Sequence, residues 1–160
     1  MSRCGKLSVC LLARVSASCA TPPNGLDQYV VAFDPNEPFG LISGYVATHR
    51  VRGLPACPDD FICMDAVFEI QLDRAELVAG SADSRISTVW AVWHTGVGGS
   101  PQMAFIVQKA EDGRLWSVGR GARVSDGRAC FGDWAWQSHR ELLMTAGGEL
   151  VDDTVCVRVS

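Results

Sequence analysis

Cysteine is the residue type whose number and spacing in this chain suggest chemistry most directly. Three of the seven cysteines lie within the first twenty residues, and the other four are Cys57, Cys63, Cys130 and Cys156. Four cysteines in a small exported domain most simply form two disulfides, and of the three possible pairings we expect Cys57–Cys63 with Cys130–Cys156. A metal site on the first pair is the alternative, although no second pair with zinc-ligand spacing lies downstream. We therefore expect disulfides, with no metal and no cofactor.

Histidine offers a second kind of chemistry. The histidines are His49, His94 and His139, and no two of them have the spacing of metal ligands. His94 ends a predicted strand and is followed by a glycine-rich loop that closes with Ser100. A serine hydrolase needs a base within hydrogen-bond reach of its nucleophile and a group that orients the base, and the chain has no G-x-S-x-G elbow. We expect no catalytic residue, and keep a hydrolase that uses His94 with Ser100 or a loop carboxylate as the alternative.

Arginine and tryptophan side chains gather around two predicted hairpins in the second half of the chain. On a helix, Trp134 and Trp136 cannot both face the core, so one of them is a candidate surface anchor. The candidate binding face comprises Arg114, Trp116, Arg120, Arg123, Trp134 and Trp136. The alternative is that the arginines lie on the solvated face of a sheet and that most of the tryptophans belong to the core.

The charge of the chain excludes several classes of partner. Ten arginines and one lysine follow residue 20, against eighteen acidic residues, so this part has a formal net charge of −7. A net negative surface repels phosphate backbones and anionic lipids. No stretch approaches the roughly 20 apolar residues that span a bilayer. We expect a protein or small-ligand partner, no nucleic acid and no transmembrane helix.

Residues 1–20 predict a signal peptide. Two basic residues precede an apolar stretch at 7–13, and the residues at 18–20 are small, as at a cleavage site. Cleavage after residue 20 leaves a single domain, 21–160, in the periplasm or outside the cell. The alternatives are lipoprotein processing at Cys19, a misassigned start and a disordered cytosolic N-terminus.

Short strands separated by turns dominate the rest of the chain. In the clearest one, Phe68, Ile70 and Leu72 alternate with polar residues, which is the period of a sheet with one solvated face. Asp112-Gly113 and Asp126-Gly127 each lie between apolar segments and predict hairpins. Further extended segments are expected at residues 41–51, 86–94, 103–107, 115–118, 122–124, 129–131 and 155–159, and six or seven strands are expected from the whole set.

One segment reads as a helix, with Asp133 as its N-cap and Gly147-Gly148 at its end. Six or seven strands with regular turns and one helix in the C-terminal half favour a mainly β fold over a parallel α/β sheet. The expected architecture is a small closed or half-open antiparallel β-barrel of the OB-like kind.

The segment from Leu41 to His94 resembles the first half of a netrin-like or tissue-inhibitor-of-metalloproteinase-like OB barrel. The resemblance rests on the strand opening Leu41-Ile42-Ser43-Gly44-Tyr45-Val46, on a long strand ending at residues 75–80 and on a following strand of valines and tryptophans. It covers about a third of the chain and implies the fold. Inhibitors of that family chelate zinc through an N-terminal cysteine, whereas the cleaved chain would begin at Thr21, so their mechanism is not implied. The stretch from Cys57 to Cys63 is also similar to one in uncharacterised exported bacterial proteins.

The expected function is that of an exported, non-enzymatic binding domain that engages its ligand through one sheet face or the hairpin loops. A structural subunit of an envelope assembly is a further alternative. The observation that separates a binding domain from a hydrolase is the surroundings of His94. A hydrolase requires His94 to line a cleft within hydrogen-bond distance of a serine or a carboxylate.

Overall fold

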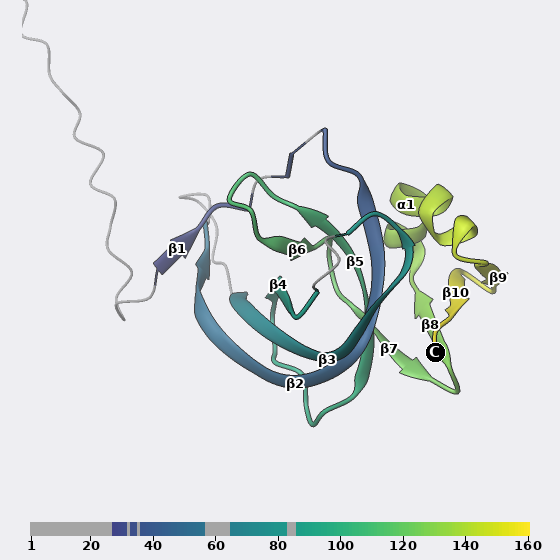
Figure 1. The fold of residues 1–160 in the computed structure, drawn as a ribbon, viewed down its shortest axis with the longest axis horizontal. Helices are drawn as coiled ribbons and strands as arrows, with labels where there is room; N and C mark the ends of the chain where they lie inside the picture. Colours follow the sequence, from purple (N-terminus) through teal and green to yellow (C-terminus); the bar gives the residue numbers. More distant parts are fainter. Residues whose placement is uncertain (1–26, 32, 35, 57–64, 83–85) are drawn as a thin grey trace, which may run out of the picture.

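The computed structural model describes residues 27–31, 33–34, 36–56, 65–82 and 86–160. The predicted signal peptide and the predicted Cys57–Cys63 disulfide therefore lie outside the described residues. The described part is mainly β, with one helix (Figure 1). Its elements are β1 (Asp27–Tyr29), β2 (Phe39–Pro55), β3 (Ala66–Gly80), β4 (Thr88–Trp93), β5 (Gln102–Lys109), β6 (Leu115–Ser117), β7 (Ala122–Ser125), β8 (Arg128–Phe131), α1 (Asp133–Thr145), β9 (Glu149–Val151) and β10 (Thr154–Arg158).

Five strands close into a barrel in the order β2-β3-β4-β6-β5, because β2 pairs with both β3 and β5. In Figure 1, β2 and β3 curve together around the barrel. Neighbouring barrel strands are antiparallel except β4 and β6, which run parallel. The predicted small β-barrel with one helix is confirmed. The described strands outnumber the expected six or seven because some, such as β1 and β9, are only three residues long and too short to show a period.

Apolar side chains of alternate strand residues fill the interior of the barrel. Phe68, Ile70 and Leu72 of β3 face inward as predicted, and Phe68 and Ile70 pair with Ala91 and Val89 of β4. The other buried members are Ile42, Val46, Trp93, Met103, Phe105 and Val107. This alternation follows from the pleat, which turns successive side chains to opposite faces.

A second layer covers the outer surface of β2 and β5. Strands β7, β8, β10 and β9 continue the sheet beyond β5, and α1 lies beside β8 and β10 (Figure 1). Leu41 of β2 and Ile106 of β5 point into this second core and meet Phe131, Leu143 and Val155. Strands β2 and β5 are therefore buried on both faces along this stretch, which explains their nearly continuous apolar sequence.

Glycines flank the helix on both sides. Its N-cap is Gly132, which has extended backbone and supplies no side-chain cap, so the prediction of Asp133 as the N-cap is wrong by one residue. At the other end Gly147 has a φ of +73°, and its N–H and that of Gly148 donate to the carbonyls of Met144 and Leu143. This is a Schellman ending, which favours glycine at the left-handed position. No described helix has both the length and the apolar character needed to cross a bilayer.

Both predicted Asp-Gly hairpins are present, with different turns. Asp126 and Gly127 both have positive φ, as in the two-residue turn that joins β7 to β8. The turn between β5 and β6 is longer: the Gly113 N–H donates to the Ala110 carbonyl, and the Ala110 N–H to that of Arg114. Only Gly113 is left-handed there.

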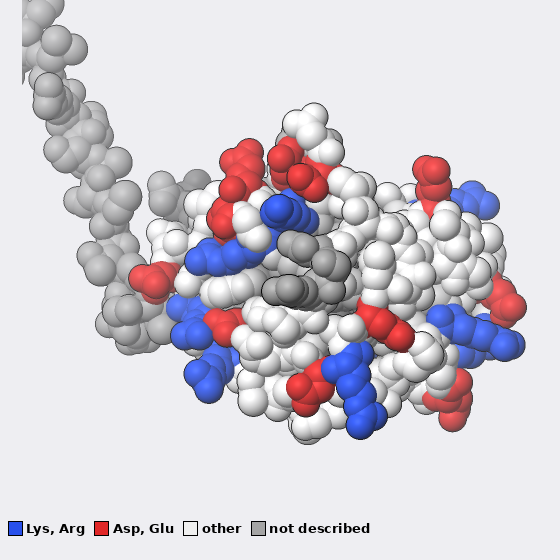
Figure 2. Space-filling model, in the orientation of Figure 1, with Lys and Arg blue, Asp and Glu red and all other residues white. Residues whose placement is uncertain are grey.

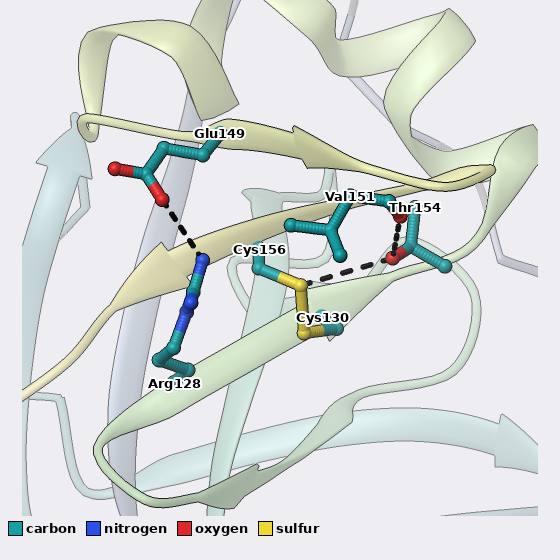
Figure 3. A network of polar contacts seen from close by, with 6 residues as sticks. All are labelled: Arg128, Cys130, Glu149, Val151, Thr154 and Cys156. Carbon is teal, nitrogen blue, oxygen red and sulfur yellow. Dashed lines mark hydrogen bonds and ion pairs between the residues drawn. A yellow bond between two sulfur atoms is a disulfide. The ribbon is translucent and has the colours of Figure 1, made fainter.

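The predicted Cys130–Cys156 disulfide is confirmed. The two cysteines are register partners on β8 and β10, with their Cα atoms 4.0 Å apart. Ala129 and Phe131 face the core, so the disulfide lies on the opposite surface of this sheet. Around it, Arg128 pairs with Glu149 at 3.0 Å and the Thr154 hydroxyl donates to the Val151 carbonyl at 2.9 Å (Figure 3). The bridge thus joins two strands already paired by hydrogen bonds.

Candidate functional site

Two hollows in the described surface lie at different places on the barrel. The larger, which we call the Trp90 hollow, has a volume of about 430 Å³ and lies between the β3–β4 connection and the β5–β6 turn. Its described walls are Glu37, Pro38, Ser81, Ala82, Ile86, Ser87, Thr88, Trp90, Lys109, Gly113, Arg114 and Leu115. On the face seen in Figure 2, basic side chains are interspersed with acidic ones.

A stacked arginine is held on the wall of the Trp90 hollow. The guanidinium carbon of Arg114 lies 4.4 Å from the centre of the Trp90 ring and 5.2 Å from that of Tyr29. Asp112, in the β5–β6 turn, accepts from the Arg114 Nη1 at 3.0 Å. A cation over an aromatic face is attracted by the ring quadrupole. Arg114 therefore has a defined position before any ligand arrives.

Trp116 does not belong to a binding face, which corrects the prediction. Its side chain is 0% exposed and packs against Trp90, with ring centres 5.8 Å apart, and against Tyr29 at 6.3 Å. Its indole Nε1 donates to the same Asp112 carboxylate that holds Arg114, at 3.3 Å. Trp116 thus packs behind Trp90, a wall residue of the Trp90 hollow, because the parallel pairing of β4 and β6 makes the two residues register partners.

The remaining members of the predicted face are dispersed. Arg120 lies just before β7 and Arg123 is the second residue of β7. Neither lines the Trp90 hollow. Trp134 and Trp136 lie at the start of α1, and their side chains are outside what the structure describes. The sequence prediction missed Trp90 itself, which lies on the face of β4 opposite Val89, Ala91 and Trp93.

A chain of polar contacts crosses the outside of β2, β3 and β4 and ends at the Trp90 hollow. The Arg52 Nε donates to Glu69 at 2.6 Å, Gln71 donates to Glu69 at 2.8 Å, and Thr88, on the hollow wall, donates to Gln71 at 3.1 Å. The hydrogen bond from Arg52 lowers the pKa of Glu69 below its usual value and raises that of Arg52. The Glu69 side chain is only 15% exposed, so its ionised form depends on these donors.

Glu69 makes stability depend on pH in the acid range. Because its pKa is lowered in the folded protein, its ionised form stabilises the fold above the ordinary value of 4.5, and this contribution is lost as the pH falls through the lowered pKa. We expect Glu69→Gln to be less stable than wild type at neutral pH, with the difference shrinking in acid. Urea unfolding midpoints at neutral pH and below pH 4.5 measure this. Glu111→Gln, at an exposed acid outside the described ion pairs, is the control, and a constant difference for Glu69→Gln would contradict the expectation.

The smaller hollow, which we call the arginine pocket, has a volume of about 250 Å³ and lies beyond the end of β4. Its described walls are Trp93, His94, Thr95, Gly96, Val97, Gly98, Met103, Arg120, Gly121 and Arg123. The Arg123 Nη2 donates to the Gly98 carbonyl at 3.4 Å, and no described acid forms an ion pair with either arginine. Barrel closure therefore brings His94 together with two arginines that the sequence assigned to a different group.

His94 meets part of the requirement for an acid–base role. It lines the arginine pocket, and its Nδ1 lies 3.5 Å from a carboxylate oxygen of Asp65, just before β3. Ser100 is exposed and is not among the described walls of either hollow. Asp65 can orient the imidazole, but the described walls of the pocket supply no serine nucleophile.

The other two histidines pack against aromatic side chains. His139 is buried in α1, with its Nδ1 3.2 Å from the Ala135 carbonyl oxygen and its ring against Phe39. His49 is half-buried beside Phe68. Within the described ranges, no three His, Cys, Asp or Glu residues gather as a metal site would require. Comparisons with protein-family models, with curated proteins and with solved structures give no match for the chain.

Proposed function

We propose that the protein is a non-enzymatic binding domain and that the Trp90 hollow receives its ligand. The observation that carries the proposal is Arg114, which Asp112 holds over Trp90 on the wall of a hollow of about 430 Å³. That volume falls among those of ordinary ligand sites, which combine an apolar wall with a few fixed polar groups. A guanidinium that is already positioned loses little conformational freedom on binding, so affinity is not spent on ordering it.

The chemistry of the walls indicates a polar ligand with both acceptor and donor groups. Lys109 and Arg114 supply positive charge, Glu37 supplies negative charge, and Ser87 and Thr88 supply hydroxyls. A side chain or loop of a protein and a small polar molecule both fit this description. We further propose export to an oxidising compartment, which the Cys130–Cys156 disulfide supports. The resemblance to netrin-like barrels stays a prediction.

Substitutions in the hollow test the proposal by selective capture. Immobilised protein is exposed to an extract of the host, and bound proteins and small molecules are identified by mass spectrometry. We expect capture by wild type to be lost in Lys109→Glu, which reverses the charge of an exposed wall residue, and to be weakened in Arg114→Gln. Arg158→Glu, at an exposed arginine outside the hollow walls, is the matched control. Capture that is equal in all four proteins, or absent from wild type, would overturn the proposal.

The second candidate function is a hydrolase centred on His94. The observation in its favour is the 3.5 Å contact between the His94 Nδ1 and Asp65 at the edge of a pocket. A base oriented in this way can activate water as well as a serine. Both side chains are nearly half exposed, however, and neither is held by a further described partner. A hydrolase would need further groups to fix the base and supply a nucleophile, whereas a binding domain needs none of them.

A further inference from the structure

We infer that the arginine pocket binds an organic carboxylate. The pocket shares no described wall residue with the Trp90 hollow, so this inference is independent of the function proposed there. Two observations carry it: arginine donors in the walls that no described acid uses, and apolar walls beside the charged ones. Trp93, also a wall residue, supplies a spectroscopic reporter.

The charged walls of the pocket are cationic. Arg120 and Arg123 both line it, and neither forms an ion pair with a described acid. A guanidinium has only donors and cannot lose its charge in a protein. Both residues are exposed, so water screens their mutual repulsion and their donors are accessible to an anion. The Arg123 Nη2 is used by the Gly98 carbonyl, which anchors this side chain and leaves its other donors for a ligand.

The indole of Trp93 has a donor that the described protein leaves unused. Trp93 is 6% exposed, and its Nε1 is buried with no hydrogen-bond partner in the described part of the chain. Its ring is fixed by stacking on Phe105, with centres 6.0 Å apart and planes at 15°. A buried N–H without an acceptor is unfavourable. This atom is covered on all sides, so a ligand does not reach it directly. Trp93 nevertheless lines the pocket, so a bound ligand is expected to change the surroundings of its indole, whose N–H signal then reports occupancy.

The size and the apolar walls favour a carboxylate over a bare phosphate. Val97, Met103 and the Trp93 ring form apolar wall beside the arginines. A volume of about 250 Å³ holds a carboxylate with a short apolar body, and is small for a drug-sized ligand. Guanidinium pairs with carboxylates through two parallel hydrogen bonds, which fixes the orientation of such a ligand. The pocket therefore matches a small aromatic or aliphatic acid, free or at the end of a peptide.

Benzoate and its neutral analogue benzamide test this inference on the wild-type protein. Calorimetric titration at low salt is expected to show saturable binding of benzoate and binding of benzamide about tenfold weaker, because the amide cannot form charge-assisted hydrogen bonds. Inorganic phosphate is the third probe. In the NMR spectrum benzoate should shift one indole N–H signal, and that signal should be missing in Trp93→Phe.

Variants locate the bound benzoate. Arg120→Gln and Arg123→Gln should each weaken benzoate about tenfold, since each removes one charged donor. Arg158→Gln, outside the pocket walls, should leave it unchanged. Equal binding of benzamide, tighter binding of phosphate than of benzoate, or no binding of any probe would each overturn the inference. The comparison of probes on wild type needs no variant, so it decides the matter even where a variant fails to fold.

Discussion

Trp116→Ala is expected to lower the free energy of unfolding by about 3 to 5 kcal/mol, as other truncations of buried aromatic side chains do. Trp116 is fully buried between Trp90 and Tyr29, so alanine leaves a cavity bounded by rings that a small barrel cannot close. The substitution also removes the indole donor to Asp112, which holds Arg114. The wall of the Trp90 hollow should therefore loosen together with the fold.

Denaturant unfolding followed by circular dichroism measures the effect of Trp116→Ala. Trp116→Phe keeps a ring in the site but loses the donor and part of the ring volume. It should cost about 1 kcal/mol for the hydrogen bond plus a packing term, less in total than Trp116→Ala. Leu150→Ala is the matched surface control, because Leu150 is 63% exposed and surface changes usually stay within about 0.5 kcal/mol. A loss for Trp116→Ala no larger than that for Leu150→Ala would contradict the assignment of Trp116 to the core.

Removing the Cys130–Cys156 bridge is expected to cost about 3 kcal/mol in the free energy of unfolding. The bridge spans 26 residues, and on the chain-entropy account a loop of that size restricts the unfolded chain by this amount. The double variant Cys130→Ser with Cys156→Ser should keep the barrel and lower the unfolding midpoint. Since β8 and β10 remain paired by hydrogen bonds, the native strands need not separate.

A reductant provides the control for the disulfide prediction. It should lower the unfolding midpoint of wild type toward that of the double variant. The double variant lacks this pair, so the reductant should not lower its midpoint further through the loss of this bridge. Cysteine mapping of protein from its native host should find Cys130 and Cys156 bonded to each other. Free thiols at both positions would contradict the proposed export as well as the stabilising role of the bridge.

The sequence was most informative where a strand is long and faces one core. The alternation of Phe68, Ile70 and Leu72 identified the inward face of β3. It failed at Trp116, because periodicity in a three-residue strand cannot say which face is covered by another element. Tyr29, from a distant strand, is part of that cover.

The arginine pocket shows a different limit of the sequence. His94, Arg120 and Arg123 were all noticed, but in separate groups, because nothing local relates the end of β4 to the start of β7. Their meeting depends on β5, which pairs with β6 along one part and with β7 along another. The buried Nε1 of Trp93, which has no hydrogen-bond partner among the described residues, has no sequence signature, since its state is defined by what surrounds the ring.

The two faces of β2 bear on how the protein unfolds. Leu41 faces the outer core and its neighbour Ile42 the barrel interior, and both are fully buried. Fraying this strand exposes both cores at once, so neither can melt and leave the other intact. The barrel and the α1 layer should therefore behave as one cooperative unit, with slowly exchanging amides of β2 and β5 reporting a single global opening.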